Sequence, residues 1–340
     1  MTHRFPVKEI ALQAGLSTAT VDRVLNNRAH VSPQTRVRVR DAIEELSSQE
    51  GQFAAKGRRI FLDIVVEAPS RFSREIRRAV ENVLHDFHPA AIRSRFAMAE
   101  IMTAKDCAAI LARIKKRGSQ GVCLKARDTP EVRAAIGELV AKNIPVLTIF
   151  TDIPGSQRLA YAGLNNVSAG KTAAYLMLNF LKPDDETVLT TLSQRAFQGE
   201  VDRFQAFKSE LLLHRPDLKL IDASGGGGLN PRTGIDVGEK IKGQARIAGV
   251  YSMGGGNQAI LKSLEESGQQ PSIFIAHDLD EDNLDLLRSD RLTFVLHHDI
   301  RADMKSAIRH ILAFHGLGEA PGSSESDIGV VTPMNIPKTD

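Results

Sequence analysis

The sequence contains no tryptophan, only 5% aromatic residues and only two cysteines, Cys107 and Cys123. Two cysteines cannot form a disulfide framework, and neither one has a histidine or the other cysteine at the spacing of a metal site. We therefore expect both to be small core residues, and we expect neither structural zinc nor a cofactor.

The sequence also lacks the run of about 18 apolar residues that a membrane span requires, and residues 1–6 do not lead into the hydrophobic core of a signal peptide. These absences predict a protein without a membrane partner that stays in the cytoplasm. The composition, with 42% hydrophobic and 25% charged residues, is that of a folded globular protein. At about 100–200 residues per domain, a length of 340 residues leaves room for two or three folded units.

The net charge of +3 is unevenly distributed along the chain. Residues 1–59 contain ten lysines or arginines and six acidic residues, which gives this segment a net charge of +4. The remaining chain contains 34 basic and 35 acidic residues and is close to neutral. A solvated basic face explains so small an excess as well as a nucleic-acid partner does, so the local pattern has to decide.

The first 47 residues carry the signals of three short helices. Apolar residues recur at helical spacing from Val7 to Ala14, and Gly15 then supplies the backbone freedom for a tight turn. Ser17 is placed to cap a second helix, and Pro33 stands at the first position of a third. The pattern predicts a trihelical helix-turn-helix unit.

Residues 7–26 and the stretch His30-Val31-Ser32 resemble the DNA-binding headpiece of LacI-type repressors. The resemblance implies that the second helix enters the major groove of operator DNA. There Thr18, Ala19 and Arg23 would reach base edges and specify the sequence. Short polar side chains would contact phosphates and position the domain: Ser17, Thr20, Asn26 and His30.

Two positions depart from the pattern of this family. Asp22 stands where a small polar residue is usual, and because phosphates repel a carboxylate we expect it to pair with Arg23 or Arg28. Gly57 stands where members commonly carry a leucine that inserts into the minor groove. Phe53 either replaces this leucine or packs on the following domain, and the sequence favours neither alternative.

From residue 60 onward, short β-rich runs alternate with longer helical stretches. The first series contains the β-rich runs 60–67, 121–125 and 145–150, and the second extends from residues 187–192 to 272–276. This alternation predicts two similar lobes, each a parallel sheet covered by helices. The predicted fold class is α/β with an N-terminal all-α headpiece, divided into a helix-turn-helix headpiece (1–47), a hinge or linker (48–59) and a two-lobed effector-binding and dimerisation domain (60–340).

Four segments of the large domain resemble the sugar-binding domains of the ribose-binding type, found in LacI-type regulators and periplasmic receptors: 151–154, 161–171, 199–207 and 254–257. The resemblance covers nearly all of residues 60–315 and implies a periplasmic-binding-protein-like cleft beyond the carboxyl ends of the strands. Carried over position by position, it implies eight ligand contacts: Phe72, Asp128, Asp152, Phe197, Arg203, Asn257, Asp278 and His298.

This set of side chains fits a sugar, polyol or sugar acid as the small-molecule effector. Carboxylates, amides and an arginine pair with neighbouring hydroxyl groups, and a phenylalanine stacks on the face of a sugar ring. Arg203 with His298 also suits a carboxylate or phosphate, so an acidic effector stays open.

Three stretches resemble enzyme motifs without completing them. Gly170-Lys171-Thr172 lacks the upstream glycine of a phosphate-binding loop, and the glycine runs 225–228 and 254–256 lack the order of a dinucleotide-binding loop. The adjacent His297 and His298 point to opposite faces of a strand, so only one can enter the cleft. We expect a ligand-responsive transcriptional repressor and no enzyme; the alternative is a sugar-binding protein or sugar-acting enzyme whose N-terminal helices contact other proteins.

The oligomeric state follows from the size of one headpiece. A single headpiece reads a short half-site, so adequate specificity predicts a homodimer on double-stranded, pseudo-palindromic operator DNA. The tail, residues 316–340, contains no leucine heptads of the kind that join dimers into tetramers.

Overall fold

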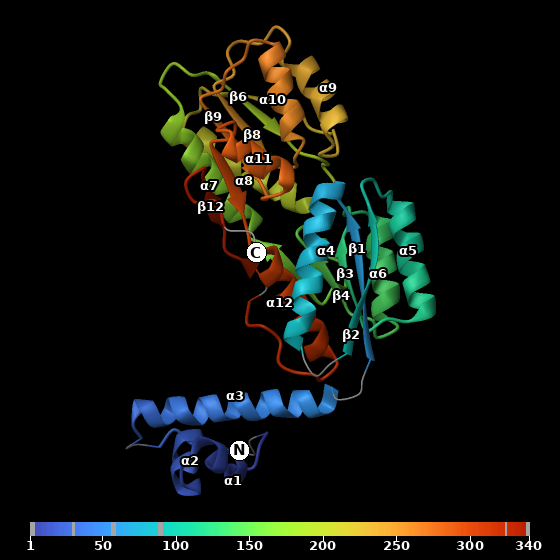
Figure 1. Cartoon of the computed structure of the whole chain (residues 1–340), viewed down its shortest axis with the longest axis vertical. Helices are drawn as coiled ribbons and strands as arrows, with labels where there is room; N and C mark the ends of the chain where they lie inside the picture. The colour runs from blue at the N-terminus through green and yellow to red at the C-terminus, as the bar shows by residue number, and fades with distance from the viewer. Residues whose placement is uncertain (1–3, 29–30, 56–58, 88–90, 324, 338–340) are drawn as a thin grey trace.

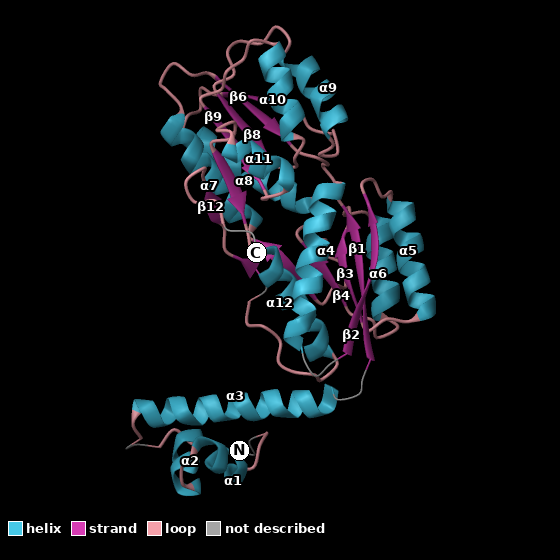
Figure 2. Cartoon of the chain, in the orientation of Figure 1, coloured by secondary structure: helices cyan, strands magenta, loops and turns pink. Residues whose placement is uncertain are grey.

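The structure, a computed structural model, describes residues 4–28, 31–55, 59–87, 91–323 and 325–337. A small helical unit at the N-terminus is followed by two α/β lobes (Figure 1). Helices flank the strands in both lobes (Figure 2). Among the described residues, no helix is long and apolar enough to cross a membrane.

The N-terminal unit has the three predicted helices, with the expected residues at their ends. Gly15 ends the first helix in the left-handed region, at a φ of 61°. The hydroxyl of Ser17 accepts the backbone N–H of Thr20 and caps the second helix. The helices are α1 (Val7–Ala14), α2 (Thr18–Leu25) and α3 (Pro33–Ala55). Their shared core is built from Phe5, Ile10, Ala11, Ala14, Val21, Val39 and Ala42.

The third helix is longer than the sequence pattern indicates. It continues to Ala55, so residues 48–55 of the segment expected to be a linker are helical. Glutamine, glutamate and alanine are good helix formers and dominate this stretch, which accounts for the extension. The backbone at Phe53 belongs to this helix, but its side chain and all of Gly57 lie outside the described residues. The replacement of the usual leucine therefore stays a prediction.

The first lobe contains a six-stranded sheet with the order β11-β5-β4-β3-β1-β2, in which all neighbours are parallel. Among the described residues, four α-helices and one short 3₁₀ helix belong to this lobe. The strands are β1 (Arg59–Glu67), β2 (Ala91–Ala99), β3 (Gly121–Lys125), β4 (Val146–Ile149), β5 (Ala160–Leu164) and β11 (Glu325–Ser326). The helices are α4 (Ser70–Leu84), the short η1 (His85–Phe87), α5 (Ala104–Arg117), α6 (Pro130–Val140) and α12 (Ile300–Phe314).

The second lobe repeats this architecture, with the strand order β12-β10-β9-β8-β6-β7. Only its edge pair β10–β12 is antiparallel among the described strands. The strands are β6 (Thr187–Thr191), β7 (Lys219–Asp222), β8 (Gly249–Ser252), β9 (Ile273–His277), β10 (Phe294–His297) and β12 (Gly329–Val331). The helices are α7 (Asn166–Phe180), α8 (Gln198–His214), α9 (Asn230–Ile241), α10 (Asn257–Glu266) and α11 (Glu281–Arg288).

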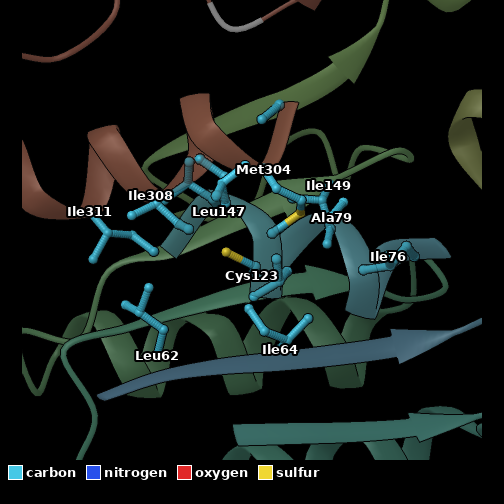
Figure 3. Packing of buried hydrophobic residues seen from close by; sticks show 14 of the residues in the cluster. Leu62, Ile64, Ile76, Ala79, Cys123, Leu147, Ile149, Met304, Ile308 and Ile311 are labelled. Carbon is cyan, nitrogen blue, oxygen red and sulfur yellow. The ribbon is translucent and has the colours of Figure 1, made fainter. Parts of the chain in front are cut away.

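The core of the first lobe explains why helix α12 returns to it from the second. Residues Leu62, Ile64, Cys123, Leu147 and Ile149 of the strands pack against α4 and α12 (Figure 3). From the helices come Ile76, Ala79, Met304, Ile308 and Ile311. Strands covered on both faces are apolar without alternation, which is why their runs stand out in the sequence. Both cysteines are buried, as predicted, and burial raises the pKa of each thiol to about 12.

Candidate functional site

The exposed face of α2 carries the side chains expected to read DNA bases. Thr18, Ala19 and Arg23 are exposed, while Val21 on the opposite face is fully buried in the headpiece core. The hydroxyl groups of Ser17 and Thr20 lie 2.8 Å apart at the start of the helix. The helix therefore presents a polar, solvent-facing surface of the size that a major groove accepts.

Asp22 has local partners that offset its charge. Its Oδ1 accepts a hydrogen bond of 2.8 Å from the side-chain amide of Asn26, and its Oδ2 lies 3.5 Å from the guanidinium of Arg28. The expected pairing is thus confirmed with Arg28. Asn26 and Arg28 are held at the end of α2, where the chain leaves the helix. His30, the remaining predicted phosphate contact, lies outside the described residues.

Arg38 fixes the angle between the first and third helices, a role that the sequence did not reveal. Its Nη2 donates a hydrogen bond of 2.7 Å to the backbone carbonyl of Ala14, at the end of α1. The last carbonyls of a helix lack partners within the helix, and a cation there also interacts favourably with the helix dipole. Arg38 therefore links α3 to the end of α1.

A cavity of about 60 Å³ lies between the two lobes of the large domain. Its walls come from the ends of strands β1, β3, β4, β6, β8, β9 and β10 and from the start of helices α4 and α8. The carboxyl ends of parallel strands meet at one edge of each sheet, so these segments converge from both lobes. Five of the eight predicted ligand residues line the cavity: Phe72, Phe197, Arg203, Asp278 and His298.

The other three predicted ligand residues do not line this cavity. Asp128 forms an ion pair of 2.6 Å with Arg133, and Asp152 forms one of 2.5 Å with Arg158. Asn257 is 2% exposed, and its side-chain amide donates to Asn283 at 2.7 Å. Each of these side chains has a partner within its own lobe, and the role of all three in ligand binding stays a prediction.

Two cations face the cavity without a carboxylate within 4 Å among the described residues. Arg203 is 5% exposed and donates to the Oδ1 of Asn166 at 2.6 Å and to the carbonyl of Met253 at 3.2 Å. Lys125 donates to the carbonyl of Glu67 at 2.9 Å. Burial lowers the pKa of Lys125, while the charges of nearby carboxylates act in the opposite direction. Both cations retain donor capacity that a ligand oxygen would use.

His298 is buried between two carboxylates at the other side of the cavity. Its Nδ1 lies 2.5 Å from the carboxylate of Asp303, and its Nε2 lies 3.4 Å from Oδ1 of Asp278. Burial works to lower the pKa of His298, but the contacts with the carboxylates of Asp278 and Asp303 outweigh it and raise the pKa to about 9. Burial works to raise the pKa of Asp278, but the contact with His298 holds it below its usual range. At neutral pH His298 is therefore an imidazolium that lies between the side chains of Asp278 and Asp303.

One carboxylate oxygen of Asp278 remains available to accept a hydrogen bond from a ligand. Its Oδ1 is buried and faces the imidazolium of His298 at 3.4 Å, but it accepts no hydrogen bond within the described part of the chain. A buried carboxylate oxygen without a donor is costly, and a hydroxyl group of a bound molecule would satisfy it. As predicted, only one of the adjacent histidines, His298, lines the cavity.

Aromatic rings supply the apolar part of the cavity wall. The rings of Phe72 and Phe150 pack edge to face with centroids 5.6 Å apart, and Phe150 lies 5.7 Å from the ring of His298. Across the cleft, the ammonium of Lys125 lies 4.0 Å from the ring centroid of Phe197. Three phenylalanines next to polar groups give the mixed surface typical of sites for small polyhydroxylated molecules.

Several lining residues were missed by the reasoning from sequence: Glu67, Arg71, Lys125, Phe150, Ser193, Glu200, His277 and Asp280. Three of them, Glu67, Lys125 and Phe150, are the final residues of runs that the sequence predicts as strands. The rule that ligands bind beyond the carboxyl ends of strands would have identified these three. His277 ends strand β9, one residue beyond the predicted run 272–276, and the remaining four lie on helices or in loops whose position depends on the packing of both lobes.

Comparison with known proteins agrees with this architecture. Residues 97–314 match the family model of a periplasmic binding protein domain, and residues 7–47 match that of bacterial regulatory proteins of the lacI family. No curated protein matches the chain by sequence.

Several solved structures share the fold at low sequence identity. GanP, a glucose-galactose binding protein from Geobacillus stearothermophilus, has a TM-score of 0.74 and 15% identity, over 83% of this chain and 100% of its own. A solute binding protein from Burkholderia graminis in complex with D-arabinose has a TM-score of 0.72 and 19% identity, over 82% and 96%. A candidate LacI transcriptional regulator from Bacteroides fragilis has a TM-score of 0.71 and 13% identity, over 82% and 98%.

The two family models account for the two parts of the molecule in the order in which the chain presents them. The helical unit with the exposed α2 face coincides with one match, and most of the two-lobed domain with the other, which spans well over half of the chain. The chain thus belongs to the family of periplasmic binding protein domains over most of its length, and it carries in front of this domain a headpiece of the lacI family of bacterial regulatory proteins.

Proposed function

We propose that the protein is a transcriptional repressor whose affinity for operator DNA is controlled by a compact carbohydrate-like effector bound between the two lobes. One observation carries this proposal: a single chain joins a helix-turn-helix headpiece with a free recognition face to a cleft lined by unpaired polar groups. A protein that only binds sugars does not need the helix-turn-helix headpiece, and a DNA-binding protein that no ligand controls does not need the cleft.

The DNA-binding role rests on the polarity of the headpiece surface. Arg23 is positioned to reach base edges from the second turn of α2, with Thr18 and Ala19 one turn earlier. Ser17, Thr20, Asn26 and His30 are proposed to contact phosphates and fix the orientation of the headpiece on the duplex.

The effector is proposed to be a sugar, polyol or sugar acid of about one ring. A cavity of about 60 Å³ holds only a few water molecules, so it suits a compact ligand. Arg203 and Lys125 supply donors, Asp278 supplies an acceptor, and Phe72 supplies an apolar face. GanP and the D-arabinose complex, which share the fold, bind ligands of this size and chemistry.

The state of the charged groups favours binding over catalysis. Arg127 forms a two-point ion pair with Glu67, and Ser193 donates to Glu200 from both its backbone N–H and its hydroxyl. These carboxylates are held by protein groups, so none of them is poised as a base beside a nucleophile. No catalytic step is part of the proposal.

A homodimer in the cytoplasm on a pseudo-palindromic operator completes the proposal. Two headpieces double the number of bases read, and the specificity of one half-site is too low to select a promoter in a genome. Ligand-induced movement of the lobes would alter the spacing of the two headpieces, because each headpiece joins its first lobe through the segment before β1.

Selection of DNA by the purified protein from a random pool tests this function. We expect enrichment of a two-fold symmetric sequence and a dimer mass by light scattering. For 6–10 phosphate contacts, affinity should fall by about 10³–10⁵ between 50 and 200 mM salt. Failure to enrich any sequence above the unselected pool would contradict the proposed function.

A further inference from the structure

One arginine of the first lobe reaches across the mouth of the cleft and binds two groups of the second. Arg71, in the first turn of α4, donates through Nε to the carboxylate of Asp280 at 2.5 Å. Its Nη2 donates to the backbone carbonyl of Gly228 at 2.8 Å. The side chains of Arg71 and Asp280 are only 13% and 7% exposed, so the bridge excludes water from this part of the cleft.

The two glycine runs of the second lobe make room for this bridge. A Cβ atom added to Gly255 would overlap Nη2 of Arg71. A Cβ atom added to Gly228 would overlap the carbonyl oxygen of Gly254. Both Gly228 and Gly255 also have positive φ, at 68° and 85°. Glycine is therefore required where the two loops meet each other and the guanidinium, which explains runs that match no nucleotide-binding motif.

Asp280 depends on Arg71 in the closed arrangement. Its other oxygen accepts the backbone N–H of Asn283 and caps α11, which fixes the carboxyl group in place. Burial raises the pKa of Asp280 to about 6, and the charge of Arg71 opposes this rise. A buried carboxylate that loses its cation is strongly unfavourable, so without Arg71 the lobes would separate until water reaches Asp280.

Arg71 and Asp280 also belong to the wall of the cavity, next to Phe72. A bound molecule that extends past this wall has to displace the guanidinium from Asp280 and Gly228. We propose that Arg71 determines ligand size: its bridge to Asp280 and Gly228 closes the cleft over molecules of about one sugar ring and excludes larger ones. This inference rests on the proposed function, because it concerns the effector of the same cleft.

A neighbouring ion pair provides a matched control. Arg74, one turn further along α4, lies 2.8 Å from Glu281 on α11 and so joins the same two helices. Its side chain is 54% exposed and that of Glu281 is 71% exposed. An exposed pair of this kind contributes little to the interaction. Arg74→Met therefore removes a charge between the same helices without opening a buried bridge.

The first test needs no ligand. Small-angle X-ray scattering of the full-length protein compares wild type, Arg71→Met, Asp280→Asn and Arg74→Met. The Asp280→Asn substitution keeps a side-chain oxygen to cap α11, so this variant removes the charge without removing the cap. We expect a larger radius of gyration for the first two variants and an unchanged one for Arg74→Met. The same radius for all four proteins, or an equal increase for Arg74→Met, would overturn the inference.

The second test measures size selection by thermal shift and calorimetry. The probes are D-arabinose, D-allose, D-fructose, D-glucose and D-galactose, each with its methyl glycoside and a disaccharide that contains it. We expect wild type and Arg74→Met to bind only free sugars, and Arg71→Met to bind at least one enlarged form about tenfold or more tightly than wild type does.

The outcomes separate the inference from the function on which it rests. Enlarged sugars that bind wild type as tightly as Arg71→Met would refute the size limit while leaving a sugar effector in place. If no probe binds any variant, both the proposed effector class and the proposed limit on ligand size are wrong. The scattering comparison still decides whether Arg71 holds the lobes together.

Discussion

Substitution of Arg203 separates effector binding from DNA binding. The guanidinium lies inside the cleft and is bonded to Asn166 and to the carbonyl of Met253. It lies in α8 of the second lobe, whereas the headpiece joins the first lobe before β1. We therefore expect Arg203→Met to abolish the response of DNA affinity to effector while leaving the affinity without effector within about twofold, because only the contact on which coupling depends is lost.

The structural cost of this substitution can be estimated from the same contacts. Hydrogen bonds from a charged donor contribute about 1.5–3 kcal/mol each, and the acceptors left behind are buried. Removal of a buried charge offsets part of this loss. We expect the free energy of unfolding to fall by about 2–4 kcal/mol for Arg203→Met and by about half as much for Arg203→Lys, which keeps one donor.

The assay is fluorescence anisotropy of labelled operator DNA, titrated with protein at zero and at saturating effector. Urea unfolding of each variant shows that it is folded under the assay conditions. Lys208→Ala is the control, because Lys208 is exposed on the same helix α8 and should change stability by less than about 0.5 kcal/mol. If Arg203→Met responds at the same effector concentration as wild type, the effector binds elsewhere and the reasoning is refuted.

Three further predictions follow from individual contacts. Arg23→Ala should cost about 1–3 kcal/mol in DNA binding and relax preference at one operator position, as measured by sequence selection; uniform weakening over all sequences would make it a phosphate contact. Asp278 and Asp303 raise the pKa of His298 from 6.5 to about 9, so the stabilisation by protonated His298 is complete below pH 6.5 and is lost as the pH rises through 9. Between pH 6.5 and 9.5, the free energy of unfolding should therefore fall by about 2–3 kcal/mol more in wild type than in His298→Gln. Arg38→Met should lower the stability of the headpiece by about 1–2 kcal/mol by loss of the bond to the end of α1, and equal hydrogen-exchange protection in both proteins would contradict this role.

The sequence predicted the elements whose signals are local. Gly15, Ser17 and Pro33 mark the ends of the headpiece helices because left-handed backbone, a capping hydroxyl and a fixed φ each act within one turn. The run 121–125 was predicted as a strand with the bounds that the structure shows, since a strand covered on both faces is apolar throughout.

The parts that the sequence did not predict depend on contacts between distant segments. The return of α12 to the first lobe is driven by packing of Met304, Ile308 and Ile311 on the sheet, and no local signal encodes that choice. The expected ligand residues Asp128 and Asp152 lie outside the cavity lining, whose shape is set by the packing of both lobes, and each pairs with an arginine of its own lobe. The bridge by Arg71 joins residues more than 150 positions apart, so it became visible only in three dimensions.

Operator affinity measured against effector concentration shows whether the cleft controls DNA binding. The protein is mixed with the operator that it selects and titrated with a sugar that stabilises it in a thermal-shift screen. We predict that saturating sugar changes the dissociation constant for DNA by about 5–150-fold, which corresponds to a coupling of 1–3 kcal/mol, and that Arg203→Met shows no change. Operator affinity that is unaffected by a sugar bound in the cleft would show that the cleft does not control DNA binding.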